Sequence, residues 1–229
     1  MKTVIAIPAY NCAPQLPRVL AGLDPERARG VHEVWVVDNG SADGTAEVSV
    51  QQSAGWSNLR VLRNRRNGNL GGTHKTVFLK AREAGATHVV ILHGDDQTKA
   101  QEAYELIALA SVGGPQTILG SRFARGARLH GYDAKRILGN RVLNGIYSVG
   151  TLRALTDLGS GLNLFALSDL DSRTYLRFGD KLSFNYELIL DLIGRGVDFR
   201  YHPITWREED QVSTARNVRS FTDGLSFLS

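Results

Sequence analysis

Three side chains that can bind a metal ion follow a short apolar segment near the middle of the chain. Residues 89–92 (Val-Val-Ile-Leu) are typical of a buried strand, and the polar run His93-Gly-Asp-Asp-Gln97 follows at once. Alternate side chains of an extended chain share a face, so His93, Asp95 and Gln97 can converge while Asp96 points away. Such a group would suit a divalent cation that holds a diphosphate. An ordinary polar loop is the alternative interpretation.

Polar residues also follow three other expected strands. The strand at 3–8 leads into Tyr10 and Asn11, the strand at 32–38 ends in Asp38-Asn39-Gly-Ser41, and the strand at 116–119 leads into Gly120-Ser-Arg122. Ligands of open α/β sheets bind beyond the carboxyl ends of the strands, so all these residues are expected along one edge. Each segment has a structural alternative, such as turn formation, but four coincidences together favour a binding site.

The pattern of elements predicts a doubly wound, mostly parallel sheet, because strands alternate with helices over the first 120 residues. Apolar runs predict strands at 3–8, 32–38, 59–62, 89–92, 116–119, 160–167 and 199–206. Helical spacing predicts helices near 17–23, 73–83, 100–110, 135–150 and 184–193, and another after an N-cap at Ser41 or Asp43. The glycine- and asparagine-rich stretch 64–72 is expected to be a loop.

Length and composition favour one large α/β domain. The chain has 229 residues, 42% of them hydrophobic, a net charge of +4 and the single cysteine Cys12, which cannot form an internal disulfide. Neither end shows a targeting pattern, and no apolar run approaches the ~18 residues of a membrane span. We therefore expect a cytoplasmic protein without a nucleic-acid partner.

Basic residues are concentrated between Arg122 and Arg141, where six arginines and lysines face a single acid, Asp133. This cluster suits phosphate-bearing partners or peripheral contact with an anionic membrane surface. A solvated helix and loop would produce the same composition, so membrane contact is left open.

Several common site designs do not occur in the sequence. There is no Gly-Lys-Ser/Thr phosphate loop, and no Gly-x-Gly-x-x-Gly follows the first strand. Ser160 lacks the Gly-x-Ser-x-Gly spacing of a nucleophile elbow. The six histidines and one cysteine show no paired spacing typical of a zinc site.

Six segments, in order along the chain, resemble motifs of the family 2 glycosyltransferases of the GT-A fold. They are 4–12, 36–45, 69–72, 93–97, 120–123 and 203–206. Within that family the likeness is closest to the dolichyl- and polyprenyl-phosphate mannose or glucose synthases. The resemblance implies a single GT-A domain over 1–229, with a Rossmann-like, mostly parallel sheet. Its nucleotide-binding part would cover about 1–122 and its acceptor-side part about 123–229.

The resemblance also implies roles for individual residues. A GDP- or UDP-sugar would bind against Pro8, Tyr10, Cys12, Val37, Asp38, Asn39, Gly94, Asp95, Gln97 and Arg122. A divalent metal, Mn²⁺ or Mg²⁺, would be held by His93, Asp95 and Gln97. His93 stands where the family has an acid, so the site either prefers Mn²⁺ or uses His93 to contact phosphate. Cys12 and Asn39 also replace acids, which leaves the preferred base open. Lys75 is a weaker phosphate candidate.

The implied reaction is an inverting transfer of a hexosyl group, with Asp95, Arg122 and Asp157 as the catalytic set. The metal and Arg122 would stabilise the negative charge that grows on the leaving diphosphate. A hydroxyl acceptor would need a general base, for which Asp157 and Glu187 are the candidates. A polyprenyl phosphate acceptor is already anionic and needs none.

The identity of the acceptor stays open at this point. Lipid-phosphate synthases carry a late Arg and Lys in a loop over the diphosphate, whereas here Arg207 and Arg216 flank three acids and Glu209 and Ala215 occupy the basic positions. A polyprenyl or dolichyl phosphate is the first expectation, and a soluble sugar, glycan or natural product is the second. A sugar nucleotidyltransferase and a non-catalytic nucleotide-binding module are the remaining alternatives.

Overall fold

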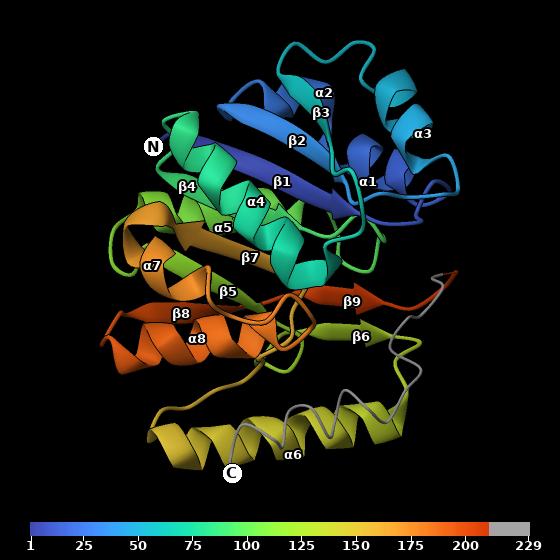
Figure 1. The fold of residues 1–229 in the computed structure, drawn as a ribbon. Coiled ribbons are helices and arrows are strands. Elements are labelled where there is room, and N and C mark those ends of the chain that lie inside the picture. Colours follow the sequence, from blue (N-terminus) through green and yellow to red (C-terminus); the bar gives the residue numbers. More distant parts are fainter. Residues whose placement is uncertain (211–229) are drawn as a thin grey trace.

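The structure, a computed structural model, describes residues 1–210 and has helices on both faces of a central sheet (Figure 1). In chain order its elements are β1 (Thr3–Ala9), α1 (Leu16–Leu23), α2 (Pro25–Ala28), β2 (Glu33–Asp38), α3 (Thr45–Gln52), β3 (Leu59–Arg63), α4 (Asn69–Glu83), β4 (His88–Leu92), α5 (Glu102–Ser111), β5 (Thr117–Ser121), β6 (Arg128–His130), α6 (Ala134–Thr151), β7 (Leu162–Ala166), η1 (Leu167–Asp169), α7 (Ser172–Tyr175), α8 (Phe184–Gly194), β8 (Phe199–Pro203) and β9 (Thr205–Arg207).

The central sheet has seven strands in the order β3-β2-β1-β4-β7-β5-β8. Its strands run parallel except β7, which is antiparallel to both β4 and β5. The predicted mostly parallel α/β sheet is thus confirmed. Because β8 pairs with β5, the predicted nucleotide-binding and acceptor-side parts share one sheet. β6 and β9 form a separate parallel pair.

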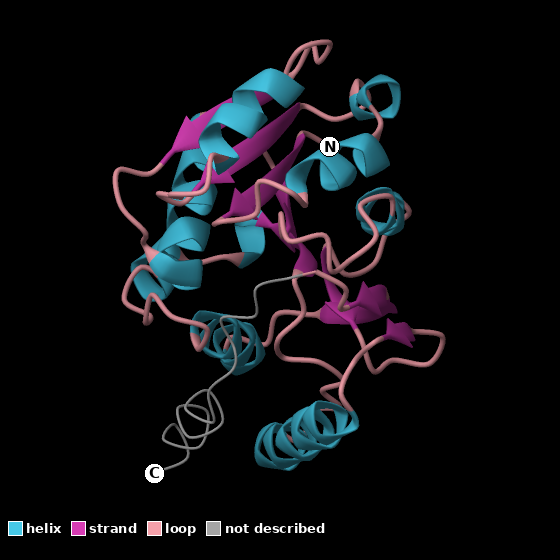
Figure 2. Ribbon diagram, turned by 90° about the vertical axis from the view of Figure 1, so that its right-hand side faces the viewer, coloured by secondary structure: helices cyan, strands magenta, loops and turns pink. Residues whose placement is uncertain are grey.

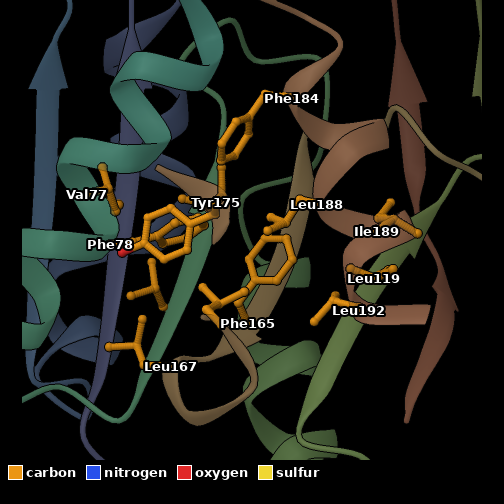
Figure 3. Packing of buried hydrophobic residues seen from close by; sticks show 14 of the residues in the cluster. Val77, Phe78, Leu119, Phe165, Leu167, Tyr175, Phe184, Leu188, Ile189 and Leu192 are labelled. Carbon is orange, nitrogen blue, oxygen red and sulfur yellow. The ribbon is translucent and has the colours of Figure 1, made fainter. Parts of the chain in front are cut away.

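Two apolar layers cover the faces of this sheet, which explains why its central strands are continuous apolar runs. Along β1, Val4 and Ala6 face the layer that includes side chains of α4 and α8, whereas Ile5 and Ile7 face the layer that includes side chains of α1 and α5. Figure 3 shows the first layer, where the ring of Phe78 packs edge-on at 5.5 Å from those of both Phe165 and Tyr175. The strands of the sheet therefore lie between two packed apolar layers.

Two local predictions near the amino-terminal half need correction. The expected loop 64–72 ends earlier, because α4 begins at Asn69. Gly71 lies in its first turn, where an added Cβ would be 2.5 Å from the carbonyl oxygen of Gly179, so glycine permits a close crossing. The N-cap of α3 is Gly44 rather than Ser41 or Asp43, although the Asp43 carboxylate accepts a hydrogen bond from the Thr45 N–H at 3.0 Å.

The last predicted strand, 199–206, is divided into β8 and β9 at Ile204. Ile204 N–H still donates to the Ser121 carbonyl, while β9 turns to pair with β6. Figures 1 and 2 place α6 beyond α8 and β9, at the margin of the first apolar layer, to which it contributes Leu143 and Tyr147. Across residues 1–210, no helix combines the length and apolar character needed to span a bilayer.

Candidate active site

The carboxyl ends of β1, β2 and β4 meet at one edge of the sheet, as the sequence predicts. Asp38 at the end of β2 lies in register with Ala9, and Asn39 N–H donates to the Ala9 carbonyl at 2.8 Å. On the other side of β1, Gly94 N–H donates to the Pro8 carbonyl at 2.9 Å. Glycine suits position 94 because a Cβ there would be 3.2 Å from the Cys12 sulfur and the Pro8 oxygen. Residues 93–97 therefore start directly beside the end of β1.

His93 and Asp95 form a close pair in this edge. The His93 N–H donates to the Gly161 carbonyl at 3.1 Å, and a Cβ at Gly161 would lie 3.0 Å from His93 Nδ1. Burial lowers the pKa of His93, an effect that Asp95 opposes and Arg122 reinforces. Burial raises the pKa of Asp95, while His93 opposes that rise. The neutral imidazole that this favours is the form that binds metals.

Asp96 has its partners on the side away from this pair, but a turn over residues 94–96 rather than strand alternation places it there. It adopts a left-handed backbone conformation with φ of 59° and is 2% exposed. Its carboxylate accepts from Arg18 Nε at 2.7 Å and from the Arg207 guanidinium, and Arg207 Nε donates to the Asp96 carbonyl at 2.9 Å. Arg207 thus holds the 93–97 segment through Asp96.

The metal-binding capacity of this edge rests on His93 and Asp95, and Gln97 contacts Asp95 through its backbone N–H. Within residues 1–210, no three His, Cys, Asp or Glu side chains are grouped so that they could hold a metal alone. His93 and Asp95 lie together, and Gln97 N–H donates to Asp95 Oδ1 at 3.3 Å. Mg²⁺ and Mn²⁺ commonly complete their coordination with water and substrate phosphate oxygens. The residues present therefore fit such an ion only together with a bound diphosphate.

Arg122, directly after β5, is locked to Asp157. Their side chains are 6% and 1% exposed. Arg122 Nε donates to Asp157 Oδ2 at 2.8 Å and Arg122 Nη2 donates to Oδ1 at 2.8 Å. The backbone N–H groups of Arg122 and Gly159 also donate to this carboxylate, both at 2.9 Å. Burial alone would lower the pKa of Arg122, but the charge and hydrogen bonds of Asp157 outweigh burial and raise that pKa, so the guanidinium stays charged.

This geometry corrects the general-base prediction for Asp157. Both carboxylate oxygens already accept two hydrogen bonds, and the group has almost no exposed surface. A base must reach the proton that it removes. Asp157 instead positions Arg122. Glu187, the other candidate base, accepts from Ser183 Oγ at 3.1 Å and from Gly179 N–H, so it caps the 179–183 turn.

Aromatic rings surround the free side of Arg122. Its guanidinium carbon lies 4.9 Å from the ring centre of Trp206, 5.3 Å from that of Phe123 and 5.7 Å from that of Tyr132. Arg122 Nη1 donates to the Tyr132 hydroxyl at 3.2 Å. Phe123 and Trp206 belong to segments that carried the family resemblance. Tyr132 had no sequence signal, because its role depends on the fold that brings residue 132 next to residue 122.

Asn39 is engaged within the chain on all four of its hydrogen-bonding positions. Its amide nitrogen donates to Asn67 Oδ1 at 2.9 Å and to the Asn69 carbonyl at 3.3 Å. Its amide oxygen accepts from Asn64 Nδ2 at 2.9 Å and from Gly68 N–H at 3.0 Å. An amide has two donors and two acceptor lone pairs, so Asn39 secures the 64–69 loop. The asparagines of this loop are site-shaping residues that the sequence reading missed.

The remaining residues of the predicted nucleotide site differ in their access to solvent. Tyr10 is 43% exposed, whereas Asp38, Val37 and Cys12 are buried. Asp38 accepts from Ser41 N–H at 3.1 Å and lies 3.3 Å from Arg63 Nε. Val37 packs in the core layer on the α4 side, and burial, aided by Asp95, raises the pKa of Cys12 to about 12. The predicted nucleotide contacts of these residues stay predictions.

A hollow of about 330 Å³ adjoins the ends of β2 and β3, lined by Gly40, Ser41, Arg63, Asn64 and Arg65. Two arginines at this rim suit an anionic ligand. Lys75, the weaker phosphate candidate, pairs its ammonium group with Asp180 at 2.7 Å and donates to the Phe178 carbonyl, and its phosphate role stays a prediction. Arg216 and Ala215 lie outside the described residues.

Comparison with known proteins places these observations in a family. The sequence model described as glycosyl transferase family 2 matches residues 4–162. Glycosyltransferase AglE of Haloferax volcanii is 39% identical over 59 residues, which are 25% of this chain and 19% of AglE. The match thus spans about a fifth of that relative's length.

Solved structures share the fold over nearly the whole chain. Glucosyl-3-phosphoglycerate synthase from Mycobacterium tuberculosis, in complex with UDP, superposes with a TM-score of 0.74 at 15% identity, over 99% of this chain and 78% of that one. The same enzyme with Mn²⁺, UDP-glucose and phosphoglyceric acid gives 0.74 at 14% identity, also over 99% and 78% of the two chains. Mannosyl-3-phosphoglycerate synthase from Rubrobacter xylanophilus gives 0.66 at 13% identity, over 99% and 72%.

Proposed function

The chain belongs to glycosyl transferase family 2 and has its GT-A fold, and from this we propose that it transfers a sugar from a nucleoside-diphosphate sugar to a phosphate-bearing acceptor, in the first place a polyprenyl phosphate. The observation that carries the proposal is the His93–Asp95 pair beside the buried Arg122, at the edge where the parallel strands end. This is where open α/β sheets bind their ligands.

The donor would bind across this edge. Pro8, Tyr10, Asp38 and Gly94 would line the nucleotide position, and Asp95, Gln97 and His93 would hold Mn²⁺ or Mg²⁺ with the diphosphate. The bound cation would supply positive charge beside the phosphate oxygens. Mn²⁺ is the first ion to test because His93 offers nitrogen, and because the M. tuberculosis synthase was crystallised with Mn²⁺ and UDP.

Arg122 contributes a charge that is fixed before the substrate arrives. Asp157 holds its Nε and Nη2, so the guanidinium cannot swing away, while Nη1 lies on the side of Tyr132. A preorganised cation stabilises charge that develops in the transition state without having to reorganise during the reaction. We assign to Arg122 the stabilisation of the leaving diphosphate and to Asp157 the positioning of Arg122.

The acceptor assignment follows from the engagement of both candidate bases. Asp157 is buried and accepts four hydrogen bonds, and the half-buried Glu187 already accepts from Ser183 Oγ and Gly179 N–H. An acceptor phosphate is already ionised at neutral pH and needs no base. This favours a polyprenyl phosphate acceptor, as expected from the resemblance.

A small phosphorylated acid is the second candidate acceptor. It is favoured by the structural likeness to enzymes whose names and bound ligands include 3-phosphoglycerate. A soluble acceptor of this class would approach the same edge of the sheet.

The test is a transfer assay with purified protein, UDP-glucose or GDP-mannose, Mn²⁺, and either a short-chain polyprenyl phosphate or 3-phosphoglycerate. We expect release of nucleoside diphosphate and a glycosylated lipid phosphate, identified by mass spectrometry. Asp95→Asn should lose this activity, while Asp198→Asn, at a side chain that is 75% exposed, should keep it. A glycosylated phosphoglycerate would select the second candidate, and no product or nucleotide release with any donor would reject both.

A further inference from the structure

Helix α6 exposes an unusually apolar face. Of its eighteen residues, Leu143, Asn144 and Tyr147 are buried. Leu138, Val142, Ile146 and Val149 are 64%, 47%, 38% and 77% exposed. A surface helix normally turns such residues toward the core. Large contiguous apolar patches on a protein surface mark sites of interaction.

These four side chains form one continuous stripe. At about 100° per residue they lie within roughly 80° of arc, and at 1.5 Å per residue they extend over roughly 16 Å. Leu152, directly after the helix, is 94% exposed and continues the stripe at its carboxyl end. Figure 2 shows α6 at the bottom of the molecule, where one side faces away from the central layers.

The charge around the stripe is positive. Lys135 is exposed within the arc of the stripe and Arg141 on its flank, and Arg125 and Arg128 are exposed just before the helix. No acidic residue occurs between 134 and 151. The acid that precedes the helix, Asp133, caps it by accepting from Arg136 N–H at 3.0 Å.

We propose that α6 is a membrane-docking helix, which lies along an anionic lipid surface with its apolar stripe inserted at the boundary of head groups and acyl chains. An amphipathic helix with basic residues beside an apolar face binds in this way. The lysine and arginine side chains beside the stripe complement the negative surface potential of such a membrane.

Charge also distinguishes a membrane from a second copy of this chain. A twofold contact over the stripe would set two copies of α6, each with Lys135, Arg136 and Arg141, against each other, because a symmetric interface pairs each surface with itself. With no acid in α6 to offset that repulsion, a like-charged pairing is disfavoured. An anionic lipid surface has no such penalty.

The helix is tied to the candidate active site. The Tyr132 hydroxyl accepts from Arg122 Nη1 at 3.2 Å and from Asn140 Nδ2 of α6 at 3.0 Å. Tyr147 of α6 stacks against Tyr186 with ring centres 6.1 Å apart. Docking through α6 would thus bring the Arg122 side of the site near the lipid surface. This last consequence rests on the proposed lipid acceptor, whereas docking itself does not.

The test measures co-sedimentation of the full chain with vesicles of pure phosphatidylglycerol or pure phosphatidylcholine. We expect binding to the anionic vesicles that weakens as salt is added. Replacing two stripe residues in Leu138→Gln/Val149→Gln should lower the partition coefficient roughly tenfold or more. The control Val50→Gln removes an apolar side chain that is 62% exposed on α3 and should leave binding unchanged.

A second pair of variants isolates the charge. Lys135→Gln should weaken binding to phosphatidylglycerol roughly fivefold. Lys80→Gln, at an exposed lysine of α4, should change it much less. The proposal is wrong if the unaltered protein does not sediment with anionic vesicles, or if the stripe and control variants weaken binding equally. It is also wrong if Leu138→Gln/Val149→Gln converts a dimer to a monomer in analytical ultracentrifugation.

Failure of docking and failure of the proposed function can be told apart. Sugar transfer to a water-soluble short-chain phosphate needs no membrane, so the double stripe variant should retain it at the unaltered rate. Vesicle binding needs no donor, so it should persist in Asp95→Asn even where transfer is lost.

Discussion

Replacing Asp157 by asparagine separates a positioning role from a general-base role. The new side chain would keep one acceptor oxygen, but its amide nitrogen would present a donor to N–H groups that now donate to the carboxylate. The buried guanidinium of Arg122 would also lose its counter-charge. Breaking one partner out of a buried ion pair costs about 3–5 kcal/mol. For a chain of this size that loss corresponds to a fall in Tm of roughly 6–20 °C.

Urea unfolding, donor binding and the pH profile of kcat together provide the assay. A positioning role predicts a loss of about 3–5 kcal/mol in the free energy of unfolding, weaker donor binding and an unchanged pH profile of residual activity. Asp198→Asn, which breaks a pair with a 75% exposed carboxylate, is the control and should cost less than about 1 kcal/mol. Our reasoning is refuted if Asp157→Asn unfolds like the unaltered protein but loses activity together with one limb of the pH profile.

Three further predictions concern groups around the site and in the sheet. Asn39→Ala removes the four hydrogen bonds that hold the 64–69 loop, so it should destabilise the chain by about 1–3 kcal/mol and increase backbone amide exchange at Gly68; unchanged exchange at Gly68 would contradict this role. Burial raises the pKa of Cys12 to about 12, so iodoacetamide should modify it slowly near neutral pH and quickly after unfolding, and equal rates would be inconsistent with that pKa. Burial lowers the pKa of His88 below its ordinary value of 6.5, so below that pH the unfolded chain binds a proton more readily than the folded chain does and the folded state loses stability as pH decreases. Urea unfolding should show that the free energy of unfolding falls less between about pH 7 and about pH 5 in His88→Gln than in the unaltered protein, and an equal fall would exclude this cause.

The sheet was largely predictable because its signals are local. Buried parallel strands must be apolar on both faces, and the runs at 3–8, 32–38 and 89–92 show this directly. The polar residues after these strands then have to share an edge, so the proximity of Asp38 and the 93–97 segment to the end of β1 follows from topology. Asp96 does bond to partners away from His93 and Asp95, but the extended alternation used to predict this does not hold, because Asp96 has a left-handed φ of 59° within a turn.

Side-chain partners were not predictable, because they depend on segments far apart in the sequence. Arg122 and Asp157 each have a plausible catalytic role when considered alone. Only the fold, which brings the end of β5 next to the 157–161 segment, shows that they form an ion pair with each other. From the sequence, Asn39 is predicted to contact the nucleotide, whereas in the structure it is hydrogen-bonded to the 64–69 loop. From the sequence, Gly71 is predicted to lie in a loop. Its closeness to Gly179 depends on how α4 packs against the 179–180 turn, which the sequence does not reveal.

Helix α6 shows a different limit of sequence reading. Its position at 135–150 was predicted from helical spacing and is confirmed as Ala134–Thr151. The same spacing of apolar residues does not say which face is covered. The sequence therefore predicts the helix, and the structure shows that Leu138 and Val149 lie on its exposed side.

The central claim is that Asp95, with His93 and Gln97, serves a divalent cation and a sugar donor's diphosphate at the end of β4. Release of UDP from UDP-glucose, or GDP from GDP-mannose, measured with Mn²⁺ and with a chelator for the unaltered protein and for Asp95→Asn, tests it most directly. We predict Mn²⁺-dependent release by the unaltered protein that the chelator abolishes, and none above background by Asp95→Asn, which should still unfold cooperatively. Full release by Asp95→Asn, or release that is indifferent to the chelator, would contradict the claim.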